Sequence, residues 1–119
     1  MTDILNKKNH YNLLYAYYGA LLTKRQQEIF EAYYGEDYSL SEISSELAVS
    51  RNAVFDSLKK VEKILDELEE KLQISKRNIE IEKTLKKYED NNQNKDCQAL
   101  IEEIKKIINN WVKQKFKGI

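Results

Sequence analysis

The sequence predicts an all-α protein with a helix-turn-helix head, a long heptad-bearing helix and a C-terminal helical arm. The 119 residues contain no proline and only three glycines, so little interrupts the helices that Leu, Lys, Glu and Ala favour. Two serines eleven residues apart, Ser39 and Ser50, each precede apolar residues that recur every three or four positions, as in a helix-turn-helix. Heptad spacing then continues well past Ser50.

The N-terminal residues are expected to form two helices. The first spans residues 5–18 and ends at Gly19. The capping box of Thr23 and Gln26 begins the second, over residues 24–34. The second helix is expected to direct Ile29, Phe30 and Tyr33 into the core.

Aromatic side chains dominate one face of the first helix, which carries Tyr11, Leu14, Tyr15 and Tyr18. Aromatic residues at helical spacing usually pack in a core or an interface, so we favour packing over a base-stacking platform. Near the N-terminus of a small domain, the same face also suits the isologous contact of a homodimer. Tyr11, Tyr15 and Tyr18 are therefore candidate partner-binding residues.

The two motif helices follow at Ser39 and Ser50. Ser39 and Glu42 form a second capping box that begins a short helix, and Val49 is expected to fill the turn. The next helix is long, and its apolar residues step by four and three: Val54, Leu58, Val61, Leu65, Leu68 and Leu72. Because a heptad seam buries its residues against another helix, we expect the C-terminal helices, a second copy of the chain, or both to cover its far end.

Residues 75–119 are expected to form a helical extension after a helix-turn-helix domain over residues 1–74. Ser75 can cap a fifth helix, and residues 89–96 hold no apolar side chain and are expected to form a loop. The last helix carries a broad apolar stripe, formed by Cys97, Leu100, Ile101, Ile104, Ile107, Ile108, Trp111 and Val112. Such a helix needs a partner, which is either the long helix or a second protomer.

Composition narrows the class of protein. Basic and acidic residues balance at 20 each, and residues 21–63 carry six basic against eight acidic side chains, a net charge of −2. Bulk attraction to nucleic acid is therefore weak.

No apolar run approaches the roughly twenty residues that span a bilayer, and the N-terminus lacks a signal peptide, so we expect a cytoplasmic protein without a membrane partner. Cys97 is the only cysteine, which excludes an intrachain disulfide, and we expect a buried thiol.

The sequence does not indicate an enzyme. His10 is the only histidine, and there is neither a glycine-rich phosphate loop nor a carboxylate–histidine set with metal-ligand spacing. We therefore expect no catalytic residue, metal, cofactor or small-molecule substrate. His10 is expected at a helix start or on the surface.

The candidate ligand-binding residues lie in the first turns of the helix after Ser50, the part of a helix-turn-helix that enters a groove. Arg51 suits a guanine edge or a phosphate, and Asn52 suits an adenine edge. Lys59 and Lys60 suit the phosphate backbone. The same residues would also suit an ordinary solvated helix face.

Two residues of this helix argue against insertion into duplex DNA. Asp56 places a carboxylate where phosphates would approach, and Phe55 stands where base-reading proteins more often carry a basic side chain. Phe55 is therefore a candidate contact for a protein. Duplex DNA stays open against RNA or protein as the ligand, because a fold does not fix its ligand.

Two resemblances bear on this choice. The chain resembles the DNA-binding region four of bacterial sigma factors in Leu-Thr-x-Arg-Gln at 22–26, Ser-Leu-Ser-Glu-Ile at 39–43 and Val-Ser-Arg at 49–51. A closer resemblance adds Asn-Leu-Leu at 12–14, Tyr-Gly-x-Leu-Leu-Thr at 18–23 and Val-Phe-Asp-Ser-Leu-Lys-Lys at 54–60. With these segments the chain is similar to the YlxM family of small bacterial helix-turn-helix proteins, whose genes neighbour those of the signal recognition particle.

The YlxM resemblance covers residues 12–72 and implies a regulatory or accessory role in the signal recognition particle pathway. The aromatic–Asp pair at positions 55 and 56 is a feature of that family. Other residues depart from the sigma pattern: Lys24 replaces a frequent proline, Ser44 an alanine and Ala48 a glycine. A left-handed backbone at Ala48 would cost about 1 kcal/mol relative to glycine.

Two functions fit these residues. The first is a non-catalytic regulator of the signal recognition particle pathway that binds DNA through Arg51, Asn52, Lys59 and Lys60. The second is an interaction module that contacts the particle's protein or RNA without binding DNA, which neutral charge and the Phe55–Asp56 pair favour. A homodimer is expected in either case.

Overall fold

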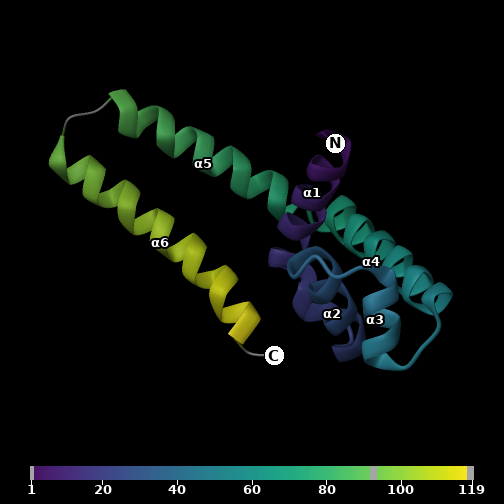
Figure 1. Cartoon of the computed structure of the whole chain (residues 1–119). Helices are drawn as coiled ribbons and strands as arrows, with labels where there is room; N and C mark the ends of the chain where they lie inside the picture. The colour runs from purple at the N-terminus through teal and green to yellow at the C-terminus, as the bar shows by residue number, and fades with distance from the viewer. Residues whose placement is uncertain (1, 92–93, 118–119) are drawn as a thin grey trace. The chain divides into compact units, whose positions relative to one another are not determined.

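The computed structural model describes the backbone of residues 2–91 and 94–117 and the side chains of residues 5–91 and 94–110. In chain order the elements are α1 (Thr2–Tyr18), the 3₁₀ turn η1 (Gly19–Leu21), α2 (Lys24–Phe30), the π turn η2 (Glu31–Gly35), α3 (Leu40–Leu47), α4 (Arg51–Leu72), α5 (Ile74–Asn91) and α6 (Lys95–Lys117). Every element in these residues is helical, which confirms the predicted all-α class. The chain divides into two compact units, Met1–Leu72 and Gln73–Ile119, and Figure 1 labels their helices.

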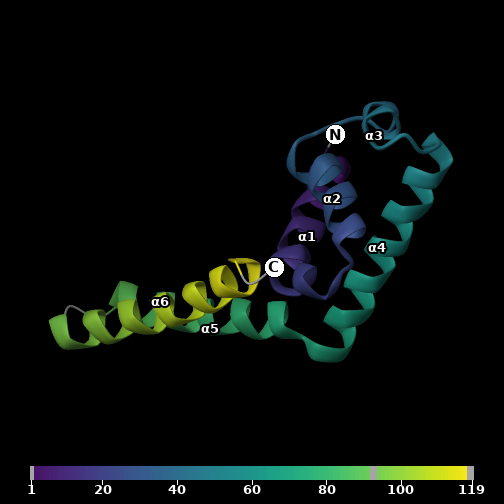
Figure 2. The same cartoon turned by 90° about the horizontal axis from the view of Figure 1, so that it is seen from below.

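The first unit is organised around α4. Helices α1, α2 and α3 all contact α4, and Figure 2 shows α3 at its N-terminal end with α1 and α2 beside it. The heptad residues Val54, Leu58, Val61 and Leu65 are at most 4% exposed, because three helices surround them. Leu72, at the end of the same seam, is 53% exposed in the single chain.

An aromatic column joins α1 to the second helical segment. The ring of Tyr15 stacks on Phe30 with centroids 4.2 Å apart, and Phe30 stacks on Tyr34 with centroids 4.6 Å apart. Gly19 follows α1 directly, as predicted, and the column explains why a glycine stands there. A Cβ atom at Gly19 would lie 2.8 Å from Cε2 of Tyr15, so any side chain would displace this ring.

The π turn η2 changes which residues face the core. Ile29 and Phe30 are buried as predicted, but Tyr33 is only half-buried and Tyr34 takes the core position. A π turn holds more residues per turn than an α-helix, so the residues within it are rotated away from the spacing that the sequence suggested. The prediction for Tyr33 is therefore wrong.

The second unit is a pair of helices, α5 and α6, that contact each other (Figure 1). The prediction that Ser75 caps the fifth helix is wrong: Gln73 adopts a left-handed backbone with φ 53°, and α5 begins at Ile74. The loop predicted over residues 89–96 is too long, because α5 continues to Asn91 and α6 begins at Lys95. Polar residues extend a helix readily when they are exposed, so a lack of apolar residues was a poor indicator of a loop.

The apolar stripe of α6 is only partly covered. Ile101 is buried, and Cys97, Ile104 and Ile108 are half-buried, so Cys97 is not the buried thiol that was predicted. Leu100 and Ile107 are 57% and 65% exposed. The side chains of Trp111 and Val112 lie outside the described residues. A single neighbouring helix covers one side of a helix, which leaves the flank of a broad stripe open.

Candidate nucleic-acid interface

Side-chain caps set the path of the chain through the helix-turn-helix. Oγ of Ser39 accepts a hydrogen bond from the Glu42 N–H at 3.1 Å, and Oε1 of Glu42 accepts one from the Ser39 N–H at 3.1 Å. Oγ of Ser50 accepts a hydrogen bond from the Ala53 N–H at 3.0 Å. This bond caps the start of α4. The predicted caps at both serines are therefore confirmed, and they satisfy backbone N–H groups that each helix start leaves without an acceptor.

The turn between α3 and α4 is left-handed at Ala48, with φ 55° and ψ 43°. Oγ of Ser44 donates a hydrogen bond to the Val49 carbonyl at 2.5 Å, and the Val49 N–H donates to the Ser44 carbonyl at 3.1 Å. Ser44, which replaces the alanine of the sigma pattern, therefore stabilises the turn through its hydroxyl group. The prediction that the Val49 side chain fills the turn is wrong, because it is exposed and only its backbone makes these contacts.

The first half of α4 presents six predicted residues to solvent, which we call the α4 surface: Arg51, Asn52, Phe55, Asp56, Lys59 and Lys60. Val54 and Leu58, between them in sequence, are buried and fix the rotation of the helix. Residues four apart lie above one another on a helix, so Arg51, Phe55 and Lys59 form one row. Asn52, Asp56 and Lys60 form the adjacent row.

Lys59 differs from the other cations of the α4 surface. Its Nζ lies 3.4 Å from Oε1 of Glu62 and 5.4 Å from the centroid of the Phe55 ring. Within the part of the chain whose side chains are described, Arg51 and Lys60 have no hydrogen-bond or ion-pair partner. Arg51 and Lys60 are therefore available to a ligand, whereas Lys59 is already engaged.

Glu62 anchors this arrangement from within the core, and the sequence analysis did not identify it. It is 7% exposed, its Oε2 accepts a hydrogen bond from the Tyr34 hydroxyl at 2.5 Å, and Lys7 Nζ lies 3.7 Å from its Oε1. Burial, followed by this hydrogen bond, raises the pKa of Tyr34. The Lys59–Glu62 spacing of three residues was the only sequence signal for this pair.

Two further phenols pair with carboxylates of the second half of α4. The hydroxyl of Tyr11 donates to Asp66 at 2.8 Å, and that of Tyr18 donates to Glu69 at 2.6 Å. Tyr15 and Tyr18 are buried and Tyr11 is half-buried, which confirms the packing interpretation of this cluster. Tyr15 and Tyr18 are consequently not exposed for the partner contact that the sequence also suggested.

The other contacts of α1 are also structural. The Tyr15 hydroxyl donates to Oε1 of Glu31 at 3.1 Å, and burial, followed by the Glu31 charge, raises the pKa of Tyr15. His10 is exposed, and its Nε2 lies 3.0 Å from Oδ1 of Asp66. Of the two places predicted for His10, the surface is therefore correct. The other, a helix start, is not, because His10 lies within α1.

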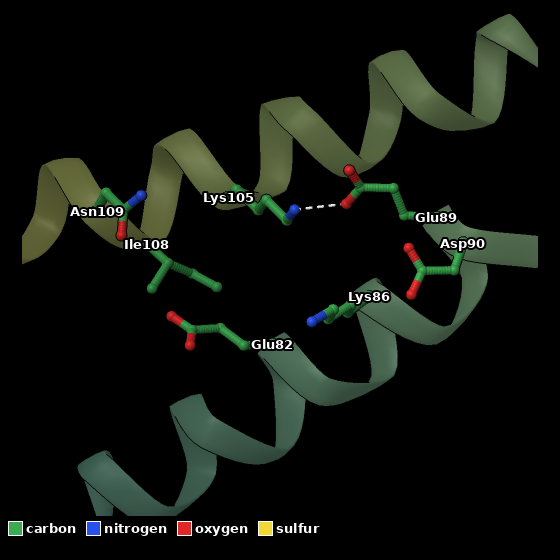
Figure 3. Close-up of a pocket in the computed structure, with 7 residues that line it drawn as sticks. All are labelled: Glu82, Lys86, Glu89, Asp90, Lys105, Ile108 and Asn109. Atoms are coloured by element: carbon green, nitrogen blue, oxygen red, sulfur yellow. Dashed lines mark hydrogen bonds and ion pairs between the residues drawn. The ribbon is translucent and has the colours of Figure 1, made fainter.

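The second unit contains a hollow of about 340 Å³ between α5 and α6, shown in Figure 3. Carboxylates of Glu82, Glu89 and Asp90 line it together with the ammonium groups of Lys86 and Lys105. Lys105 Nζ lies 2.5 Å from Oε2 of Glu89 and ties the two helices together. Three carboxylates against two ammonium groups leave a net charge of only −1, so the hollow has little preference for a ligand of one charge.

The described residues contain neither a candidate membrane span nor a candidate metal-binding cluster. None of their helices combines the length and the apolar character needed to cross a membrane. None of their clusters of His, Cys, Asp or Glu has the arrangement needed to hold a metal ion.

The capped motif helices, the left-handed turn and the exposed first half of α4 define a helix-turn-helix protein. The chain belongs to the UPF0122 family, described as "Putative helix-turn-helix protein, YlxM / p13 like", which matches residues 5–109. The resemblance to the YlxM family is thereby confirmed.

Relatives in several bacteria are similar to this chain. A UPF0122 protein of Lactococcus lactis subsp. cremoris (strain MG1363) is 43% identical over 88 residues, which cover 71% of this chain and 79% of the relative. A UPF0122 protein of Thermoanaerobacter sp. (strain X514) is 56% identical over 75 residues, covering 63% of this chain and 64% of the relative. One of Streptococcus gordonii is 50% identical over 68 residues, covering 57% and 62%.

Proposed function

We propose that this chain is a non-catalytic regulatory or accessory protein that binds nucleic acid through the α4 surface. The observation that carries the proposal is a pair of exposed cations, Arg51 and Lys60, on a helix that a capped turn holds in place; neither cation has a partner among the described side chains. Three basic side chains face one acidic side chain between residues 51 and 60, a net charge of +2. This half of α4 thus attracts phosphate although the whole head does not.

Duplex DNA is the nucleic acid that a helix-turn-helix most often reads. In such a complex Arg51 would face a guanine edge or a phosphate, Asn52 an adenine edge and Lys60 the backbone. Lys59, which was predicted to contact phosphate, instead supports Phe55 in this proposal. Asp56 and the weak overall charge limit the affinity that a duplex would gain from electrostatics.

The resemblance to the YlxM family implies a place for this activity in the signal recognition particle pathway. We propose that the ligands of the α4 surface belong to that pathway. A second candidate function, contact with the particle's protein without DNA, is favoured by the exposure of Phe55, which is 46% exposed. Aromatic side chains of this kind often carry much of the energy of protein interfaces.

We also propose that the chain forms a homodimer. With Tyr15 and Tyr18 buried, the exposed Leu100 and Ile107 of α6 are the better candidate contact. Exchanging Ile107 for Glu should then shift the mass measured by analytical ultracentrifugation from dimer to monomer. An unchanged mass would exclude this face.

A binding titration tests the nucleic-acid proposal. The full chain would be titrated into a fluorescein-labelled 20-base-pair DNA duplex and into a labelled 12-nucleotide RNA across a range of salt concentrations. Binding that weakens as salt rises supports contact with phosphates, which the α4 surface is proposed to make. Absence of binding, or binding indifferent to salt, with both probes would exclude it.

A further inference from the structure

We infer that Phe55 is a stacking platform for an unpaired base, so that the preferred ligand of the α4 surface is a single-stranded or looped nucleic acid. The inference rests on the proposed nucleic-acid function and names the class of ligand. It starts from an aromatic ring that is 46% exposed at the centre of a row of cations.

The ring of Phe55 combines partial exposure with support from one cation. Lys59 Nζ lies over it, 5.4 Å from the centroid, and the same ammonium group is 3.4 Å from the buried carboxylate of Glu62. Tyr34 in turn holds that carboxylate through its hydroxyl group. No other aromatic ring among the described residues contacts Phe55, so Lys59 supports one face of the ring and no ring covers the other.

An open aromatic face suits an unpaired base better than a paired one. Bases within a duplex already stack on their neighbours, and a side chain in the major groove reaches only their edges, where phenylalanine finds little beyond the thymine methyl group. Unpaired bases expose their faces, and proteins bind them by stacking aromatic side chains on them. Phe55 is therefore better suited to a base that has left the stack.

The neighbours of Phe55 suit the rest of a nucleotide. Arg51 lies one turn earlier in the same row, and Lys60 lies in the adjacent row, where each can meet a backbone phosphate. Asn52 supplies an amide for a base edge. A protein partner would instead meet a ring bordered by charged groups, whereas interface anchors usually sit among apolar neighbours. Charge therefore favours a polyanion over a protein surface.

The test compares single-stranded and paired probes. Fluorescence anisotropy would measure the binding of the full chain to a labelled 12-nucleotide RNA, to DNA of the same sequence, and to the corresponding duplex. The variants are Phe55→Ala, Phe55→Tyr and, as a matched control, Tyr38→Ala, which removes another exposed aromatic ring of the same unit. Circular dichroism would verify that each variant is folded, as expected for changes at exposed positions.

The expected result is a loss of about tenfold in single-strand affinity for Phe55→Ala, with the salt dependence unchanged because no charge is removed. Phe55→Tyr, which keeps an aromatic ring, should retain more single-strand affinity than Phe55→Ala, and Tyr38→Ala should bind like the parent protein. The duplex should bind more weakly than either strand. Comparing the RNA strand with the DNA strand then shows which sugar is preferred.

If Phe55→Ala and the parent bind the single strands equally well while Arg51→Ala binds more weakly, the stacking role is overturned and the proposed function stands. Equal losses on duplex and single strand would also overturn it. No binding of any probe by the parent protein would overturn both.

Discussion

The two halves of α4 use their charged residues in opposite ways. In the second half, the acidic side chains of Glu62, Asp66 and Glu69 accept hydrogen bonds from tyrosine hydroxyl groups of the head. In the first half, Arg51 and Lys60 have no such partner among the residues whose side chains are described. Charge on a single helix thus stabilises the fold at one end and remains available to a ligand at the other.

The contrast between the two halves shows that the net charge of a segment is a poor guide to its ligand. The head region carries an excess of acidic residues, which by itself argues against nucleic acid. Yet Glu62 is nearly inaccessible and faces Tyr34 and Lys59 rather than a ligand. Within the exposed first half of α4, basic side chains outnumber acidic ones.

The largest effect is expected from the apolar seam beneath both halves. Leu65→Ala removes a side chain that is 0% exposed and should lower the free energy of unfolding by about 2–5 kcal/mol. Leu72→Ala, one heptad later on the same seam, should cost no more than about 0.5 kcal/mol, because its side chain is largely exposed. Urea denaturation of both variants makes the measurement. Equal losses would show that the far end of the seam is covered in solution.

The carboxylates of the second half should rank next. Glu62→Ala leaves the buried Tyr34 hydroxyl without its acceptor and should cost about 1–3 kcal/mol. Glu67→Ala is the matched control, because this exposed residue only approaches Lys63 at 4.0 Å, and surface pairs of this kind contribute little. Similar unfolding midpoints for both variants in urea would contradict a structural role for Glu62.

A smaller effect of opposite sign is expected at the turn that leads into the exposed half. Ala48 has φ 55°, so Ala48→Gly should raise the free energy of unfolding by up to about 1 kcal/mol. Ala53→Gly, the same exchange inside α4, should lower it by a similar amount. Thermal unfolding followed by circular dichroism compares the two. A destabilising Ala48→Gly would show that the left-handed turn is not strained.

The smallest effect is expected in alkali, where the tyrosine hydroxyl groups that pair with carboxylates of the second half of α4 begin to ionise. Burial raises the pKa of Tyr34 and of Tyr11 in the folded protein, so the stability that they contribute is fully present below the pKa of an unfolded tyrosine, about 10. It is lost as the pH rises above that value. Unfolding free energies measured from pH 8 to pH 11 should therefore fall more steeply in the parent than in Tyr34→Phe. Parallel curves would be inconsistent with this linkage.

Local patterns in the sequence predicted much of the head. The capping boxes, the serine at the start of α4 and the heptad seam through Leu65 depend on residues close in sequence, and the structure confirms them. The candidate residues of the α4 surface followed from the same helical spacing. All six side chains are exposed, as expected for residues that face away from the core.

Features that depend on distant contacts were not predictable. The π turn that brings Tyr34 into the core has no evident local signature, and the partners of Glu62 and Asp66 lie on other elements. Without them, the sequence did not show that Lys59 pairs with Glu62 or that Tyr15 and Tyr18 are buried. The hydrogen bond from Ser44 across the turn was missed because the sequence presented this residue only as a departure from a pattern.

The most direct test of nucleic-acid binding by the first half of α4 is the salt dependence of binding after its cations are removed. Anisotropy titrations would compare the parent, Arg51→Ala/Lys60→Ala and, as a charge-matched control, Lys83→Ala/Lys87→Ala on α5. Each lost phosphate contact lowers the slope of log affinity against log salt by about 0.7 to 0.9. The slope should therefore fall by about 1.4 to 1.8 in the first variant and stay unchanged in the control. An unchanged slope in Arg51→Ala/Lys60→Ala would contradict the assignment of this surface to nucleic acid.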